Sequence, residues 1–151
     1  MATFPEHWFY HLEGSTIEGV LPGLLEKTLA KGWRALVKLP QEALPAMDEL
    51  LWTFRDESFL PHGRDDEPMA EWQPILLSHS IEDATGFDAV FLLGGKDIAN
   101  MSGVSRSMIM INGRSQTDVV QERQRWKKLK ETGAKLSYYQ QNAQGRWEKK
   151  A

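Results

Sequence analysis

The chain has 151 residues, of which 41% are hydrophobic and 26% charged, and its net charge at pH 7 is −3. This composition and length are typical of a globular protein with one domain, spanning residues 1–151. The lack of cysteine excludes a disulfide framework, a cysteine nucleophile and thiolate metal ligands. No apolar run approaches the roughly 20 residues of a membrane span, and the N-terminal stretch lacks a signal-peptide pattern. We therefore expect a soluble, cytoplasmic protein.

The first half of the sequence alternates strand and helix patterns. Residues 8–12 predict a strand. The stretch Ser15-Thr-Ile-Glu18 has the form of a capping box, and it predicts a helix that Gly32 ends. A strand over 34–39 and a helix over 43–55 follow, with Pro45 tolerated in the first turn of that helix. The polar, acidic segment 62–72 is expected to be a loop.

The second half continues the alternation. Buried strands are predicted over 75–78, 88–93 and 108–111. The segment 94–107 is expected to be a loop or one irregular helix. A helix over 117–130, closed by Gly133, precedes a last strand over 135–139. The alternation predicts a three-layer, Rossmann-like α/β domain, in which helices cover a mostly parallel sheet.

Such a fold suggests nucleotide binding, but the sequence lacks the motifs. The first strand-to-helix turn, Leu12-Glu-Gly-Ser-Thr16, does not match G-x-G-x-x-G, and Leu93-Gly-Gly-Lys-Asp97 lacks the spacing of a P-loop. His7 and His11 lie on one face of a predicted strand but roughly 13 Å apart, too far to share a metal ion. We therefore expect no catalytic residue, no cofactor and no metal site.

Charge is divided unevenly along the chain. Residues 123–151 contain nine Lys and Arg but two acidic residues, a net charge of +7, so residues 1–122 carry −10. A basic C-terminal element on an acidic body suggests an acidic partner, either nucleic acid or an acidic peptide. A solvated helix face explains the same charges without a partner.

Two aromatic residues are candidates for a binding surface. In the helix over 43–55, Trp52 lies about 100° from Leu51, a member of the apolar stripe, and is flanked by charged residues. An exposed tryptophan often marks an interface, although the next loop could also cover it. On the later helix, Arg123 and Trp126 share a face. Trp126 is either part of the core with Arg123 at its edge, or part of a binding site.

The stretch Asp48-Glu-Leu-Leu-Trp-Thr-Phe-Arg-Asp-Glu-Ser-Phe-Leu-Pro-His62 resembles the chi subunit of bacterial DNA polymerase III holoenzyme. The C-terminal helix also has the expected form, Glu122-Arg-Gln-Arg-Trp126, with Gly133 seven residues after the tryptophan. The resemblance extends over roughly residues 8–147. It implies a non-catalytic accessory protein without a cofactor that links the clamp-loader complex to single-stranded-DNA-binding protein (SSB), contacts DNA only indirectly and acts at the replisome.

The resemblance also implies partners and contact residues. The acidic C-terminal tail of SSB is expected to bind one pocket, and the psi subunit or another clamp-loader subunit to bind elsewhere. The pocket residues implied are Trp52, Phe59, Arg123 and Trp126. Val119 and Asn112 stand where other members have a lysine and an aliphatic residue. Four side chains are candidates for pocket charge: Arg125, Lys127, Lys128 and Lys130.

Two other functions remain open from the sequence. Single-stranded nucleic acid could bind the basic segment 123–150 directly, with its aromatic residues as stacking platforms: Trp126, Tyr138, Tyr139 and Trp147. Residues 1–122, with a net charge of −10, would repel a nucleic acid and so oppose this alternative. A Rossmann-like enzyme without recognisable motifs is the third possibility.

Overall fold

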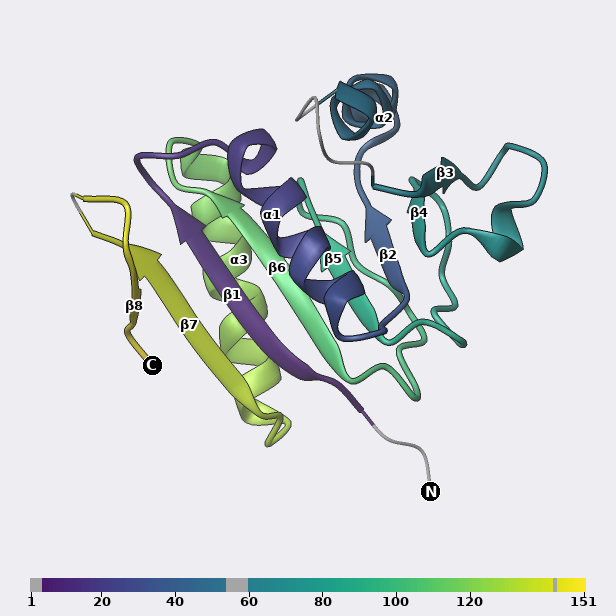
Figure 1. The fold of residues 1–151 in the computed structure, drawn as a ribbon. Coiled ribbons are helices and arrows are strands. Elements are labelled where there is room, and N and C mark those ends of the chain that lie inside the picture. Colours follow the sequence, from purple (N-terminus) through teal and green to yellow (C-terminus); the bar gives the residue numbers. More distant parts are fainter. Residues whose placement is uncertain (1–3, 54–59, 143) are drawn as a thin grey trace.

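The computed structural model describes residues 4–53, 60–142 and 144–151. Their strands form one eight-stranded sheet with the order β3-β4-β2-β5-β6-β1-β7-β8 (Figure 1). Neighbouring strands are parallel except β7 and β8, which are antiparallel. The prediction of an α/β fold with a mostly parallel sheet is confirmed. The strands are β1 (Glu6–Leu12), β2 (Ala35–Lys38), β3 (His62–Arg64), β4 (Ile75–Ser78), β5 (Ala89–Leu92), β6 (Arg106–Asn112), β7 (Leu136–Gln141) and β8 (Trp147–Lys149).

The helices are α1 (Ile17–Ala30), α2 (Leu44–Thr53) and α3 (Gln116–Glu131), with 3-10 turns η1 (Gln41–Ala43) and η2 (Ala70–Trp72). The start of α1 differs from the prediction by one residue. Thr16, not Ser15, is its N-cap, and the Thr16 hydroxyl accepts a hydrogen bond from Gly19 N at 3.0 Å. Ser115 caps α3 in the same way, through Asp118 N at 3.2 Å. Each cap satisfies a backbone donor that the first helical turn leaves without a partner.

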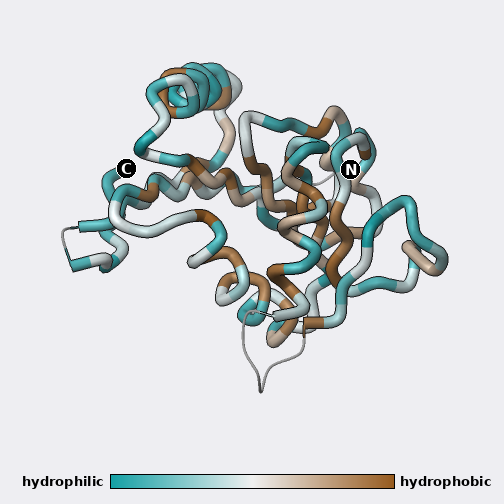
Figure 2. Tube along the Cα trace, turned by 90° about the horizontal axis from the view of Figure 1, so that it is seen from above, coloured by the Kyte–Doolittle hydropathy of each residue, from teal (hydrophilic) through white to brown (hydrophobic). Residues whose placement is uncertain are grey.

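The two faces of the sheet have separate cores, which makes the fold three-layered. Leu21 and Leu25 of α1 and Leu51 of α2 pack on one face. Val119 of α3 packs on the other face, together with Phe87, Ile98 and other residues of the two loops that flank β5. In Figure 2 the hydrophobic stretches concentrate in the central layer, between more hydrophilic segments outside. Figure 1 likewise shows α1 and α3 on opposite sides of the sheet.

The sequence missed two strands, β3 and β8. β3 lies in the segment expected to be a loop, and its sequence, His-Gly-Arg, has no apolar alternation to reveal it. Both strands have three residues and lie at the ends of the sheet, where β3 pairs with β4 and β8 with β7. Edge strands this short depend on the neighbour that they pair with, so local sequence predicts them poorly. The segment 94–107 contains no helix, in agreement with the first of its two predicted forms.

Candidate functional site

The carboxyl ends of β1 and β6 meet at one edge of the sheet, next to the start of α3. Gly113, which follows β6, donates its N–H to Leu12 O at 2.7 Å. A Cβ atom on Gly113 would lie 2.3 Å from Leu12 O and 2.7 Å from His11 Nε2. Only glycine fits here, because any larger residue would push the two strand ends apart. The close approach places the His11 ring next to the turn that leads into α3.

His11 belongs to a polar cluster that joins β1 to β7. Its Nδ1 is 2.7 Å from the Tyr138 hydroxyl, and its Nε2 is 3.2 Å from Glu13 Oε1. Gln140 donates to the same Glu13 oxygen at 2.9 Å. Sequence reasoning did not single out this cluster. Its members lie far apart in the sequence, and only the pairing of β1 with β7 reveals that they meet.

Arg123 lies close enough to this cluster to influence its protonation. Burial lowers the pKa of His11; the Glu13 carboxylate opposes this effect and the Arg123 guanidinium adds to it. Burial raises the pKa of Tyr138, and Arg123 works against that rise. In both cases the Arg123 guanidinium lowers the pKa, because a nearby positive charge disfavours protonated His11 and favours ionised Tyr138. Arg123 is itself exposed and forms no ion pair within the described part of the chain.

Lys127 and Lys130 extend the positive charge along the exposed face of α3. They lie four and seven residues after Arg123, so the three side chains occupy one side of the helix. Neither lysine has a carboxylate partner among the described residues. We call Arg123, Lys127 and Lys130 the basic face of α3. Unpaired cations along one helix face can attract an acidic peptide.

Arg125 does not contribute to the basic face, contrary to the expectation that it could supply pocket charge. Its side chain turns inward, where Nη2 donates to the backbone oxygens of Gly95 at 3.1 Å and Lys96 at 2.8 Å. Its Nε lies 3.2 Å from Glu122 Oε2. Through these bonds, Arg125 attaches α3 to the loop after β5.

Trp126 and Val119 lie on the inner side of α3, and Asn112 lies nearby at the end of β6. Trp126 is half-buried, with its ring edge-on to Phe9 at 5.2 Å and to Tyr138 at 5.5 Å between centroids. Val119 is buried in the same core, and Asn112 is exposed at the end of β6. Trp126 is therefore only partly available to a ligand, beside the basic face.

Trp52 lies elsewhere. It is 52% exposed on α2, and its ring lies 4.6 Å from the His62 ring of β3. It lines a cavity of about 330 Å³ together with Pro61 and Pro68. α2 packs on the opposite face of the sheet from α3, near the other edge. The structure therefore does not bring Trp52 into one pocket with Arg123 and Trp126. Phe59 lies outside the described residues.

The aromatic residues proposed as a stacking platform for nucleic acid are also separated. Trp126 and Tyr138 pack against the core on the α3 face. Tyr139 and Trp147 pack against the core on the α1 face. Successive residues of a strand point to opposite faces, so Tyr138 and Tyr139 cannot serve one platform. The expected platform of four rings does not exist in this form.

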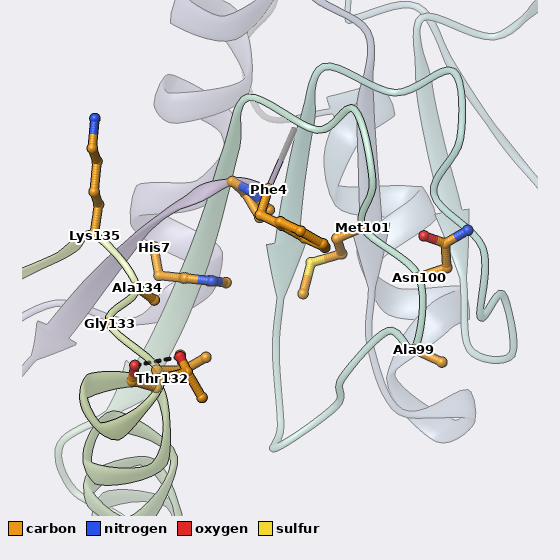
Figure 3. Close-up of a pocket in the computed structure, with 11 residues that line it drawn as sticks. Phe4, His7, Ala99, Asn100, Met101, Thr132, Gly133, Ala134 and Lys135 are labelled. Atoms are coloured by element: carbon orange, nitrogen blue, oxygen red, sulfur yellow. Dashed lines mark hydrogen bonds between the residues drawn. The ribbon is translucent and has the colours of Figure 1, made fainter. Parts of the chain in front are cut away.

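A cavity of about 640 Å³ lies at the far end of α3, between Phe4, Met101 and Leu129 (Figure 3). The figure shows His7 directed into it, and His7 Nδ1 is buried without a hydrogen-bond partner. Burial lowers the pKa of His7, so its ring favours the neutral form. The cavity can take an apolar group, but Arg123 and Trp126 do not line it. Within the described residues, no group of three or more His, Asp or Glu is placed to hold a metal.

Glu122 gives α3 a testable pH response. It is 1% exposed, and burial raises its pKa from 4.5 to about 7; the nearby Arg125 opposes this shift, while Asp118 and Asp97 add to it. The folded protein thus retains a proton that the unfolded chain loses, so the Glu122 contribution to the free energy of unfolding falls as pH rises from 4.5 to about 7.

We expect Glu122→Gln to remove this contribution. Relative to the parent, the variant should gain roughly 1–2 kcal/mol of unfolding free energy between pH 5 and pH 8. Urea unfolding at several pH values measures the difference. His7 and His11 contribute with the opposite sign below pH 6.5, equally in both proteins, and so cancel in the comparison. A difference that stays constant with pH would show that Glu122 is ionised in the folded state.

The fold and the site define a small α/β protein whose candidate site is a surface of cationic and aromatic side chains. Residues 4–137 match the family model described as "DNA polymerase III chi subunit, HolC". The match covers most of the chain, which therefore belongs to the chi subunit family of DNA polymerase III. A search among curated proteins finds no match. No helix within the described residues is long and apolar enough to cross a membrane.

Proposed function

We propose that this chain is a non-catalytic cytoplasmic adaptor of the replisome that binds the acidic C-terminal tail of SSB on the basic face of α3. Membership of the chi family supports a role as an accessory of DNA polymerase III. In this role the chain links SSB to the clamp-loader complex through the psi subunit or another clamp-loader subunit. The observation that carries the proposal is the exposed guanidinium of Arg123, which forms no ion pair with the described residues and acts on the pKa of Tyr138, whose ring contacts Trp126.

The chemistry of the surface suits such a tail. A free terminal carboxylate can accept two parallel hydrogen bonds from a guanidinium, which presents its donors as a planar fork. An aromatic residue at the tail end can rest on the exposed edges of Trp126 and Tyr138. Acidic residues further upstream would meet Lys127 and Lys130 along α3. Val119 and Asn112 would form the margin of this site toward β6.

Glu13 limits where the carboxylate can bind. Its side chain is 3.2 Å from His11 Nε2, so a second carboxylate placed there would be repelled. The ligand must therefore approach Arg123 from the exposed side of α3. This restriction favours a tail that runs along the helix.

The proposal is tested by titrating the protein with a synthetic acidic peptide that ends in phenylalanine. Several weak contacts, less the cost of ordering the peptide, lead us to expect a Kd in the micromolar range, about −6 to −8 kcal/mol. Amidation of the peptide terminus should weaken binding at least tenfold, because it removes the charge that Arg123 recognises. Affinity should also fall between 50 mM and 300 mM salt. Nuclear magnetic resonance shifts confined to α2 would contradict the proposed site.

A further inference from the structure

Among the described residues, no helix covers the part of the sheet formed by β7 and β8 on the α1 side. α1 packs on β2 and β6, and α2 packs on β3 and β4. Figure 1 shows that neither helix lies in front of β7 or β8. Aromatic side chains cover this open part of the sheet: Trp8, Tyr10, Tyr139 and Trp147. Three strands thus supply one continuous aromatic surface.

The four rings contact one another in sequence across the strands. Trp8 lies 5.4 Å from Tyr139, Tyr139 stacks on Tyr10 at 5.5 Å, and Tyr10 meets the edge of Trp147 at 5.0 Å between centroids. All but Tyr10 are only partly buried. Their outer surfaces face a groove of about 320 Å³ against α1, whose opposite wall includes Trp33. We call this site the aromatic groove.

Cations surround the aromatic groove. The Arg106 guanidinium lies 3.7 Å from the Trp8 ring centre and 5.2 Å from that of Trp33, and Lys31 Nζ lies 4.8 Å from the latter. Lys27 also lines the groove, and Lys149 is in register with Tyr139 at its outer margin. None of the four cations forms an ion pair with the described residues.

The hydrogen-bonding groups of the groove are mainly donors. Trp8 Nε1 is buried with no acceptor in the described structure. The Thr28 hydroxyl already donates to Leu24 O at 2.8 Å and can still accept. Arg106, Lys27 and Lys31 can only donate. A site of this kind selects a ligand with negative charge and planar, apolar rings.

We propose that the aromatic groove binds single-stranded nucleic acid, with bases on Trp33 and Tyr139 and phosphates on Lys27, Lys31 and Arg106. A strand carries one charge and one ring in every residue, and so matches the alternation of cations and rings in the groove. An acidic peptide would neutralise the cations but would leave most ring surfaces uncovered. The groove lies on the other face of the sheet from the basic face of α3, so this inference does not depend on the proposed function.

The test uses the full chain and a fluorescein-labelled oligonucleotide of twelve deoxythymidines, followed by fluorescence anisotropy at 50 mM salt. Lys27→Glu/Lys31→Glu changes two exposed side chains that make no ion pair in the described structure. Its affinity for the oligonucleotide should fall at least tenfold. If each lysine contacts one phosphate, the slope of log K against log salt should become shallower by about 1.4. Trp33→Leu should weaken binding about tenfold with less change in this slope.

Lys128→Glu/Lys135→Glu is the matched control, since it makes the same charge change at exposed positions away from the groove. The salt slope of this control should stay close to that of the parent. Its affinity for the oligonucleotide should fall much less than that of the Lys27→Glu/Lys31→Glu protein. No binding by the parent, an equal loss in both double variants, or equally tight binding of thymidine monophosphate would each overturn the inference. So would a loss of acidic-peptide binding in the Lys27→Glu/Lys31→Glu protein with oligonucleotide binding intact. Peptide titration of the same proteins tests the SSB-tail proposal separately.

Discussion

Arg123→Ala should lower the affinity for an acidic, phenylalanine-terminated peptide by about 10- to 100-fold. A hydrogen bond to a charged group contributes about 1.5–3 kcal/mol, and each 1.4 kcal/mol is a factor of ten in Kd. Arg123 is exposed and makes no ion pair in the described structure, so its removal should leave the free energy of unfolding nearly unchanged. Isothermal titration calorimetry at low salt measures the affinity, and urea unfolding checks the fold.

Two variants make this result specific. Arg123→Lys retains the charge but loses the planar fork, and should recover only part of the affinity. Trp52→Ala should bind the peptide as the parent does, because Trp52 lies on the opposite face of the sheet. If Trp52→Ala abolishes binding while Arg123→Ala does not, the tail site is on α2 and the proposed location is wrong.

Phe9→Ala should cost about 3–5 kcal/mol of unfolding free energy, the usual loss for a large buried aromatic residue. Phe9 is fully buried at the centre of β1. Its ring meets the edge of Trp126 at 5.2 Å and lies parallel to Tyr138 at 6.1 Å. Truncation would leave a cavity where α3 and β7 join the sheet. Urea unfolding followed by circular dichroism measures the loss.

Phe4→Ala is a suitable comparison, since Phe4 is 74% exposed and its truncation should change stability by less than about 1 kcal/mol. Phe9→Leu should recover part of the loss, because it refills some of the volume but not the ring contacts. Similar stability of Phe9→Ala and Phe4→Ala would mean that α3 does not depend on Phe9 for its attachment.

The two proposed surfaces lie on opposite faces of one sheet, and each contains several cationic side chains. The basic face of α3 lies on one side, and the aromatic groove with Arg106, Lys27 and Lys31 lies on the other. A protein with this arrangement could hold an SSB tail while it contacts the strand beside it. The separate variants of Arg123 and of Lys27 with Lys31 test each contact alone.

Local sequence was sufficient for most elements of the fold. Strong apolar runs such as those of β4 and β5 predict buried strands, because strands covered on both faces need apolar residues at nearly every position. Gly133 ends α3 as the sequence predicted, because its backbone adopts the left-handed conformation, with φ of 79°. Strands of three residues at the sheet edges carry no such pattern and were missed.

The sequence by itself determined the fold class and the family. It located the cations of the C-terminal segment by their number, nine Lys and Arg in residues 123–151, but left open whether Arg123 lies at the edge of the core or in a binding site. Only the tertiary structure decided which side chains meet. It placed Trp52 and Arg123 on opposite faces, turned Arg125 inward, and brought His11 to Tyr138. The physical reason is that strand order and the choice of sheet face depend on contacts between residues far apart in the sequence, which no local pattern records.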